Sequence, residues 1–507
     1  MGDIEFLFAL LLGAALLVRV ADLVRIPYPI VLVLGGLSAG LIPGVPDLEV
    51  DPDIIFLVFL PPLVHAAAWY ASPQQLLAER KPLGLLTVGL VLVTMAVVAV
   101  VAHALVPGMG WTAAFILGAL LAPTDPVAAL ATFGKAGAPA RATLLVEGEA
   151  MLNDAVALVA YRVAVAAAVS GVFSIADAGW DVVVAVVGGV LVGLAVGWAT
   201  RHVQRRLPDL TLTIFLSILA SYAAYIVAEE LGASGILATV VAGLYLSWHS
   251  HETFDADTRL SAAAVWDVLV FGLNAAIFVL LGLQFPELVE DLELGSLLVP
   301  ALAVSAAVIV TRLVFLLLPW SGFGESLPER LAIGWAGMRG AISLAAALAV
   351  PLAVDERGEI LFITVVVILV TLVGQGLSLR GVLHVLGVEE DRDWSPDEAL
   401  ARRAATEAAL ERLGELEDEH DLPDRLVQRV RELYQARMRR TQAALEGDEH
   451  AQESPGAPKH LAALRRELIG VERDTLLRLR DEGSLTSDVL RQIERDLDLE
   501  EARFSGP

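Results

Sequence analysis

Long apolar segments recur along most of this chain and constrain its fold more than any other feature. Between Met1 and about Val388 they are roughly 17–25 residues long, enough for a helix to cross about 30 Å of hydrocarbon. The chain is 56% apolar, against roughly 45–50% in typical soluble domains. From Glu389 onward the sequence is charged, with a helical pattern. We therefore expect an all-α polytopic membrane domain at 1–388 and a helical cytoplasmic tail at 389–507, with a regulatory or a purely structural role.

The loops between these segments alternate in charge. One set of alternate loops contains Arg25, Arg80 and a series of further basic residues up to Arg380. In the other set, Arg357 is the only basic residue. Positively charged loops stay on the cytoplasmic side of a membrane. The alternation therefore predicts about thirteen spans, an N-terminus outside and a C-terminus in the cytoplasm. The expected spans are 5–24, 28–43, 53–70, 82–106, 111–134, 143–170, 180–203, 210–231, 234–248, 262–284, 296–318, 330–351 and 359–385.

Composition excludes several classes of function. The chain has no cysteine, so disulfides, zinc–thiolate sites and thiol catalysis are excluded. Its net charge is −25, and no basic patch suggests nucleic acid as a partner. No pattern calls for a cofactor. The N-terminal stretch "MGDIEF" lacks a basic region, so the first apolar segment is expected to be a retained helix and not a cleaved signal peptide.

The sixth expected span carries polar residues at membrane depth. In "EGEAMLNDAVALVAY", Asp154 lies near the middle of the span, Glu149 and Asn153 are one turn apart, and Glu147 shares a face with Asp154. An ionisable group at that depth costs about 2.5–3.5 kcal/mol or more, and it usually marks a functional site with a partner. The alternative is a buried polar cluster that only packs helices. Three carboxylates in eight residues favour a site.

The fifth span contains a second polar interruption, in "FILGALLAPTDPVAALATFG". Pro123 and Pro126 bracket Thr124 and Asp125, and each proline removes an N–H and disturbs the preceding residue's helical geometry. Free backbone at membrane depth is tolerated where it lines a cavity or is covered by protein. A cation is a natural partner for bare carbonyls and a hydroxyl. A simple proline kink is the alternative, but it does not account for Asp125.

The twelfth span, "LAIGWAGMRGAISLAAALAVP", contains Arg339 among glycines that loosen the helix. A lone arginine at that depth needs a carboxylate, and Glu149 and Asp125 are the candidates. Two interrupted, charged helices in distant parts of a membrane domain are the sequence pattern of an inverted-repeat transporter.

These motifs resemble a known family. "LAPTDPVAA", "VEGEAMLNDAVALV" and "GWAGMRGAISLAAALAVP", in this order, are similar to the bacterial sodium/proton exchanger branch of the monovalent cation/proton antiporters. The resemblance covers about residues 5–388. It implies about thirteen transmembrane helices with inverted repeats and two broken crossing helices, a plasma-membrane homodimer, and exchange of Na⁺ for H⁺ in pH and sodium homeostasis. K⁺/H⁺ exchange is the alternative within the family.

The resemblance also implies residue roles. Asp154 binds the cation or the proton, and Asn153 is its partner in the Asn-Asp pair of the electroneutral branch. Thr124 supplies oxygen, so Asp154 and Thr124 hold Na⁺ as the transported substrate. Glu149 pairs with Arg339, and Asp125 complements the half-helix dipoles. If only Asp154 changes its occupant, exchange is one-for-one and electroneutral.

Two positions depart from the family pattern. Ala150 stands where many members have a serine, and "PPLVHAAAW", with His65 and Ala66, lacks an acid that many members carry in the third span. The cation site is therefore expected to have fewer protein oxygens. His65 is expected to be a buried core residue, with a pH-responsive role as the alternative.

Rival functions use the same residues less completely. A cation channel is compatible with these carboxylates, and a proton sensor acting through the tail ranks low because no signalling motif is present. "GASG" at Gly232–Gly235 matches intramembrane serine proteases, but Ser234 would need a histidine base within reach, and a tight turn explains the motif. We therefore expect a transporter and not an enzyme.

Overall fold

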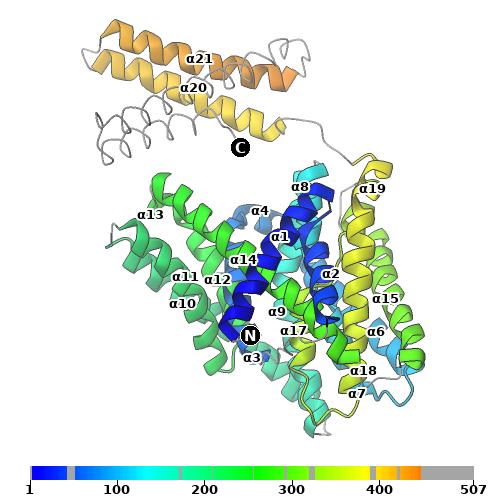
Figure 1. Ribbon diagram of the computed structural model, residues 1–507. Helices are drawn as coiled ribbons and strands as arrows, with labels where there is room; N and C mark the ends of the chain where they lie inside the picture. The colour runs from blue at the N-terminus through cyan, green and yellow to red at the C-terminus, as the bar shows by residue number, and fades with distance from the viewer. Residues whose placement is uncertain are drawn as a thin grey trace, which may run out of the picture. The chain divides into compact units, whose positions relative to one another are not determined.

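The computed structural model describes two compact units of the chain, Met1–Glu390 and Asp391–Pro507. Every regular element in the described part of the chain is a helix (Figure 1). The described residues are 3–24, 26–42, 52–136, 138–170, 174–207, 209–254, 256–289, 294–318, 326–388, 396–419 and 423–446.

The helices of the first unit follow the apolar segments of the sequence. Each of the thirteen expected ranges overlaps one helix or a run of two or three consecutive helices. The first group is α1 (Asp3–Val24), α2 (Tyr28–Gly40), α3 (Pro52–Tyr70), α10 (Ile175–Gln204), α11 (Leu210–Glu230), α12 (Gly235–Trp248), α13 (Ser250–Thr253) and α14 (Ala256–Val289). The second is α4 (Pro73–Ala78), α5 (Arg80–Gly84), π-helical η1 (Leu85–Leu90), α6 (Val91–Leu105), α7 (Trp111–Leu121), α8 (Val127–Ala136), α9 (Ala140–Ser170), α15 (Leu294–Leu317), α16 (Leu327–Trp335), α17 (Ala341–Leu348), α18 (Arg357–Leu369), π-helical η3 (Val370–Gln375) and α19 (Gly376–Leu386).

Length and composition show which helices can cross a membrane by themselves. Among the described residues, seven helices are long and apolar enough, and four further apolar helices are shorter. The seven are Arg80–Leu105, Ala140–Ser170, Ala178–Gln204, Leu210–Glu230, Thr258–Leu280, Gly295–Leu317 and Arg357–Leu386. The polytopic all-α fold is thus confirmed, whereas the count of thirteen spans stays a prediction.

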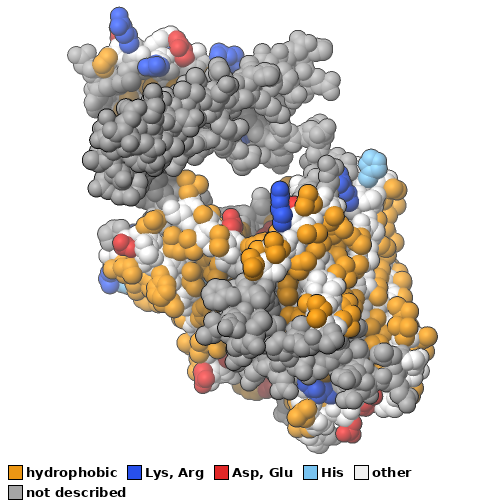
Figure 2. Space-filling view, viewed as in Figure 1, with side chains coloured by type: hydrophobic (Ala, Val, Ile, Leu, Met, Phe, Trp, Pro, Cys, Tyr) orange, Lys and Arg blue, Asp and Glu red, His pale blue; other side chains and the backbone are white. Residues whose placement is uncertain are grey.

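The outer surface of the first unit is apolar. Figure 2 shows hydrophobic side chains over much of its described face, and leucine, valine and tryptophan side chains of α10, α14 and α15 are exposed. In contrast, 72% of the most apolar stretch of the helix Arg357–Leu386 is buried. An apolar exterior around a packed interior is expected where hydrocarbon, and not water, surrounds the helices.

The two groups form two bundles that meet along the site. We call α1–α3 with α10–α14 the scaffold bundle, and α4–α9 with α15–α19 the site bundle, because most helix contacts lie within each set. α9 contacts α12 and α3 across the boundary, and α17 contacts α3 and α14. Arg162 of α9 and Glu229 of α11 also form an ion pair of 2.6 Å between the bundles. α9 therefore contacts the scaffold bundle as well as its own site bundle.

Two helices of the site bundle are broken in the middle. The first break, residues 122–126, separates α7 from α8, and the second, residues 336–340, separates α16 from α17. The prolines of the first break and the glycines of the second account for the loss of helical hydrogen bonds. The breaks touch, since the Asp125 amide donates to the Met338 carbonyl over 2.8 Å. The expected pair of broken crossing helices is confirmed.

Close backbone contact also fixes the scaffold bundle. A Cβ atom on Gly36 of α2 would lie 2.3 Å from the Val279 carbonyl oxygen, and one on Gly282 of α14 would lie 2.2 Å from the Val33 carbonyl oxygen. Only glycine leaves room for two helices to approach this closely. α2 and α14 therefore touch through their backbones.

The described part of the second unit is a pair of helices. α20 (Pro396–Glu419) and α21 (Asp424–Glu446) pack on each other, and Arg431 pairs with Glu417 over 2.5 Å. Proline at the first position of α20 fits the expected helix start. The expected cap at Ser395 and the apolar stripe from Leu461 to Val471 lie outside the described residues.

Candidate functional site

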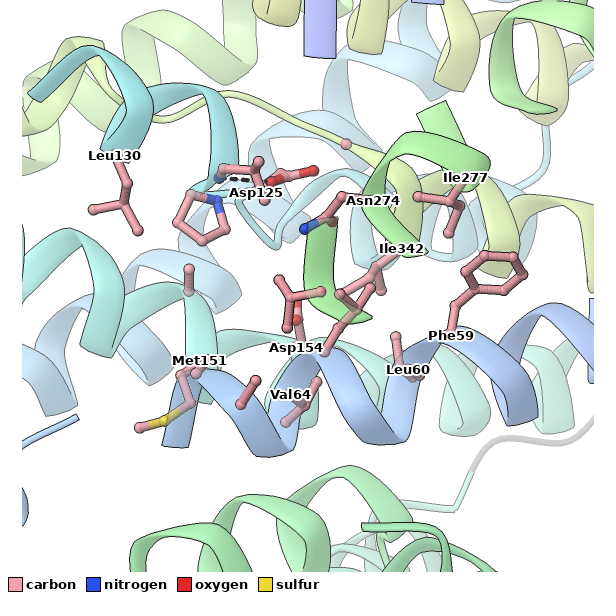
Figure 3. Close-up of a pocket in the computed structure, with 18 of the residues that line it drawn as sticks. Phe59, Leu60, Val64, Asp125, Leu130, Met151, Asp154, Asn274, Ile277 and Ile342 are labelled. Atoms are coloured by element: carbon pink, nitrogen blue, oxygen red, sulfur yellow. Dashed lines mark hydrogen bonds between the residues drawn. The ribbon is translucent and has the colours of Figure 1, made fainter. Parts of the chain in front are cut away.

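A cavity of about 350 Å³ lies between the two bundles, at the breaks (Figure 3). Four acids line it: Asp125, Glu147, Asp154 and Asp267. No lysine, arginine or histidine is among the described residues that line it. A cavity with several carboxylates, low-dielectric walls and no cationic lining attracts cations and excludes anions. The neutral polar residues of its wall are Tyr28, Tyr70, Thr124, Asn274 and Ser343.

Asp154 of α9 is the most buried of these four acids. Its side chain is buried, with 5% of the residue exposed, and it lines the cavity opposite the first break. Figure 3 shows Asp154 on the α9 wall, with Asp125 and Asn274 on the walls around it. Among the described residues, none hydrogen-bonds to its carboxylate. Asp154 can therefore offer its oxygens to a cation or to a proton in the cavity.

Glu149, on the same helix, is in the opposite situation. Arg312 of α15 binds it through both guanidinium nitrogens, and the Nη2–Oε2 distance is 2.8 Å. Both side chains are only 2% exposed. Arg312 also donates to the Ile333 carbonyl oxygen over 3.2 Å. This bidentate pair is charge-assisted and geometrically specific, so Glu149 is a fixed anion behind the cavity wall and does not line the cavity.

The expected pairing of Glu149 with Arg339 is therefore wrong. Arg339 is buried, but its guanidinium donates to backbone carbonyls: Nε to Leu121 over 2.8 Å, Nη2 to Ala122 over 3.4 Å, and Nη1 to Gly337. The physical reason is the break itself, because the ends of α7 and α16 leave carbonyls without intrahelical donors. A guanidinium with five donors satisfies them, and α15 supplies the counter-charge to Glu149.

Asp125 occupies the complementary position. Its Oδ1 accepts from the Val127 amide over 2.9 Å at the start of α8. A Cβ on Gly340, which precedes α17, would overlap its Oδ2. The carboxylate thus lies at the N-termini of two half-helices, where the dipole favours negative charge. Arg339 lies at the C-terminal ends of α7 and α16, so each charge faces the favourable end.

Thr124 and Asn153 link the two sides of the wall. The Thr124 hydroxyl lies 3.5 Å from Glu149 Oε1 and accepts from Asn153 Nδ2 over 2.9 Å. Because the Glu149 carboxylate only accepts, the Thr124 hydroxyl donates to it. Thr124 lines the cavity, whereas Asn153 is buried behind the wall. Asn153 is therefore linked to the cavity by its hydrogen bond to Thr124.

Comparison with known proteins now fixes the family. Residues 7–385 match the family profile described as "Sodium/hydrogen exchanger, transmembrane". This chain belongs to the sodium/hydrogen exchanger family. Members of this family are transporters and not enzymes, and their substrates are ions.

Relatives and a solved structure agree with this assignment. The exchanger is 33% identical over 511 residues to an uncharacterized Na⁺/H⁺ exchanger of Mycobacterium tuberculosis, covering 95% of this chain and 93% of that one. It is 32% identical over 377 residues to a sodium, potassium, lithium and rubidium/H⁺ antiporter of Bacillus subtilis, covering 69% and 56%. The sodium proton antiporter MjNhaP1 of Methanocaldococcus jannaschii shares its fold, with a TM-score of 0.62, 21% identity and coverage of 76% and 98%.

The two departures from the family pattern both lie at the exchanger's cavity. Ala150 and Ala66 line it and contribute no side-chain oxygen. His65 does not line it: the ring is fully buried, with centroids 5.4 Å from Trp266 and 6.5 Å from Trp69. The placement agrees with the expected core role of His65.

Sequence reasoning missed three residues of this site: Arg312, Asp267 and Tyr70. The Tyr70 hydroxyl donates to Asp267 Oδ1 over 2.9 Å and lies 3.1 Å from the Ala263 carbonyl oxygen. Arg312 and Asp267 are charges inside expected spans, so the rule that highlighted Arg339 applies equally to them. The sequence shows these two charges at membrane depth, but it does not show which residues they contact.

Ser234 has a structural role. It is the N-cap of α12, where its hydroxyl oxygen accepts from the Leu237 amide over 3.3 Å. Serine is among the preferred residues at this position. The turn expected from "GASG" thus explains the motif without a nucleophile.

Proposed function

We propose that this exchanger carries Na⁺ across the plasma membrane in exchange for H⁺, by competition of the two ions for Asp154. The observation that carries the proposal is the contrast between buried carboxylates on α9. Glu149 is paired with Arg312, whereas Asp154 faces an acidic cavity without a cationic partner among the described residues. Only the unpaired group is free to change its occupant.

Competition at one carboxylate determines the stoichiometry. If Glu149 stays ionised, the site crosses the membrane with either one Na⁺ or one H⁺ on Asp154, and the net charge is the same in both directions. Exchange is then one-for-one and electroneutral. Its rate has a bell-shaped pH dependence, because protons occupy the site at low pH and are scarce at high pH.

Neighbouring residues complete the proposed ion site. Thr124 has a hydroxyl at the cavity wall, and oxygen is the ligand type that suits Na⁺. Asn153 holds Thr124 without adding a titratable group, and Asp125 adds negative potential. We expect water to occupy the coordination positions that Ala150 and Ala66 leave without protein oxygen.

K⁺/H⁺ exchange is the second candidate. Ala66 and Ala150 at the cavity wall reduce the number of fixed ligands, and a site completed by water discriminates weakly by ion size. The Bacillus subtilis relative is named for exchange of sodium, potassium, lithium and rubidium. Breadth toward larger alkali ions is therefore a specific expectation for this chain.

Proteoliposomes test both points. A pH gradient is imposed, and Na⁺, Li⁺, K⁺ or Rb⁺ is added in turn at equal ionic strength while the internal pH is recorded. Dissipation by Na⁺ supports the proposal, and equal dissipation by K⁺ supports the broader specificity. If none of the four ions dissipates the gradient, cation/proton exchange at Asp154 is wrong.

Electroneutrality needs a separate measurement. Where K⁺ proves not to be a substrate, K⁺ and valinomycin clamp the membrane potential during Na⁺-driven proton flux. We expect the initial rate to be independent of the imposed voltage. A rate that follows the voltage contradicts the one-carboxylate stoichiometry. Asn153→Asp, which adds a titratable group, is the matched variant in which voltage dependence is expected.

The remaining assignments concern the whole molecule. We propose an outside N-terminus, a cytoplasmic tail and a homodimer, from the loop charges and from the family resemblance. Protease accessibility of tags at the two termini in oriented vesicles tests the topology, and crosslinking in the membrane tests the dimer. Tags on the same side would contradict an odd number of spans.

A further inference from the structure

A second cavity, of about 530 Å³, lies at the boundary between the two bundles and is distinct from the ion cavity in its chemistry. Its walls come from α4, α5, η1 and α9 of the site bundle and from α10 and α12 of the scaffold bundle. We call it the boundary groove. Most of its lining is apolar: Pro73, Leu76, Leu77, Leu83, Gly84, Met151, Leu152, Leu194, Val241, Leu244, Tyr245 and Trp248, together with Arg80, Thr87 and His249.

Polar groups mark one end of the boundary groove. Arg80 and Trp248 line the groove and are exposed, and His249 joins them at the wall. Tryptophan and arginine at the end of apolar helices are typical of the level of the lipid headgroups. By the loop charges, this end of the helices is the expected cytoplasmic one. The groove therefore extends from headgroup level into the hydrocarbon region.

The positive charge of Arg80 is available to a ligand. Its Nη1 donates to the Leu77 carbonyl oxygen over 3.1 Å, and no described carboxylate pairs with it. The adjacent acid, Glu79, is occupied by Arg141 through bonds of 2.7 and 2.8 Å. Lys81 follows directly and is exposed. A guanidinium with free donors binds phosphate well, and two adjacent cations attract anionic lipid.

We propose that the boundary groove binds an anionic glycerophospholipid, with the phosphate at Arg80, whose neighbour Lys81 adds positive charge, and an acyl chain along the leucines. Charge complementarity selects the headgroup, and the membrane setting of the surrounding helices supplies the lipid. A soluble anion lacks the apolar chain that the groove accommodates. This site is separate from the ion site and does not depend on which cation is exchanged.

Met151 gives this lipid a route to the ion site. Met151 lines both cavities, the boundary groove on one side and the ion cavity on the other. It lies on α9, one turn from Asp154. An occupant of the groove therefore contacts the helix that carries the ion-binding carboxylate, at the boundary between the bundles. Bound lipid is expected to change the exchange rate as well as stability.

Gly84 offers a way to fill the groove without touching its charge. A Cβ on Gly84 would meet no atom within 4 Å, although the residue lines the groove. In Gly84→Leu the new side chain takes the space of the acyl chain. Gly381 of α19 is the matched control, since a Cβ there also meets nothing within 4 Å and it does not line the groove. Arg205, an exposed arginine that does not line the groove, is the matched control for Arg80.

Binding to the purified full chain tests the site directly. Delipidated protein in detergent is titrated with phosphatidylglycerol, phosphatidylcholine or inorganic phosphate, and binding is followed by native mass spectrometry and by the melting temperature. We expect phosphatidylglycerol to bind best, Arg80→Gln to weaken it about fivefold, Gly84→Leu to weaken it by a similar factor, and Arg205→Gln and Gly381→Leu to leave it unchanged. Equal binding of phosphatidylglycerol to Arg80→Gln and wild type overturns the proposal, as does equal stabilisation by phosphatidylcholine or by phosphate alone.

Transport provides the second readout. Exchange is measured in liposomes of phosphatidylcholine with increasing fractions of phosphatidylglycerol, with whichever alkali ion the wild type exchanges. We expect the wild-type rate to depend on the phosphatidylglycerol fraction and this dependence to be lost in Arg80→Gln and Gly84→Leu, but retained in both controls. A dependence that persists in Gly84→Leu contradicts the groove as its origin. If the wild type shows no exchange in any lipid mixture, the proposed function is contradicted, whereas the lipid site is still decided by the binding measurement.

Discussion

Glu149 and Asp154 lie little more than one turn apart on α9, and their surroundings are opposite. Glu149 faces the interior of the site bundle, where Arg312 takes both of its oxygens. Asp154 faces the boundary with the scaffold bundle and a cavity lined by three further acids. One helix thus presents a neutralised carboxylate to one side and an unpaired carboxylate to the other. The ion pair of Glu149 with Arg312 fixes the packing of α9 in the site bundle, whereas Asp154 is available to bind an ion.

The two helix breaks repeat this division. Arg339 and Gln375 donate to carbonyls at the ends of α7 and α16, so the exposed backbone behind the cavity is satisfied. On the cavity side, Asp125 adds charge at two helix N-termini. Buried polar groups are costly when they lack partners; the carbonyls behind the cavity have theirs, whereas Asp154 at the cavity accepts no hydrogen bond from the described residues.

Asp154→Asn makes the largest expected change. It removes the only ionisable function of that side chain with little change in size, so exchange should fall to the level of protein-free liposomes while insertion and melting temperature stay close to wild type. Initial rates of pH-gradient dissipation measure the effect. Asp267→Asn, at the same cavity, is the control and should retain measurable exchange. Wild-type rates in Asp154→Asn would sink the mechanism.

Arg312→Leu tests the paired side. It leaves Glu149 buried without its cation, a situation that typically costs 3–5 kcal/mol. Chemical unfolding in detergent or bicelles measures the loss. The double variant Glu149→Leu/Arg312→Leu should recover most of the stability, because no buried charge is then unpaired. A loss of stability as large in the double variant as in the single one would contradict this account.

Arg339→Leu should cost less stability than Arg312→Leu. It strands carbonyl oxygens of Leu121, Ala122 and Gly337 but no carboxylate, and a neutral acceptor left without a partner costs less than a buried charge left unpaired. Exchange should also decrease, since the same carbonyls hold the break in place. Comparing unfolding midpoints of the two leucine variants under one condition decides the order. The reverse order would mean that Arg339 carries the main counter-charge after all.

Arg141→Gln gives the smallest expected effect, because its ion pair with Glu79 is partly exposed. Arg141 holds the pKa of Glu79 below its usual value, chiefly through their hydrogen bond. A lowered folded-state pKa stabilises above the unfolded-state pKa, about 4.3, and the gain is lost as pH falls through the folded-state pKa. The free energy of unfolding of the variant should be about 0.2–1 kcal/mol lower than that of wild type at pH 7, and the difference should shrink as pH falls below the unfolded-state pKa and vanish below the folded-state pKa of Glu79. A difference that grows in acid would contradict the pairing.

The sequence predicts the breaks and Asp154 because their causes are local. Pro123 and Pro126 disrupt hydrogen bonds within their own helix, and a carboxylate in the middle of an apolar span needs an explanation wherever the helix packs. Partner choice is not local. Glu149 and Arg312 are 163 positions apart, and two arginines at membrane depth were equally eligible until helix packing placed α15 beside α9. Asp267 and Tyr70 were missed for the same reason, because their contact joins α14 to α3.

The glycine contact between α2 and α14 sets the distance between two helices that line the ion cavity. Tyr28 of α2 and Asn274 and Ile277 of α14 line the ion cavity, and the spacing of these helices is set where Gly36 and Gly282 touch. An added methyl group at either glycine pushes apart two surfaces that form part of the cavity wall. The width of the ion cavity therefore depends on two positions that do not line it, and we expect a larger residue at either glycine to widen the cavity, whereas a larger side chain inside it would narrow it.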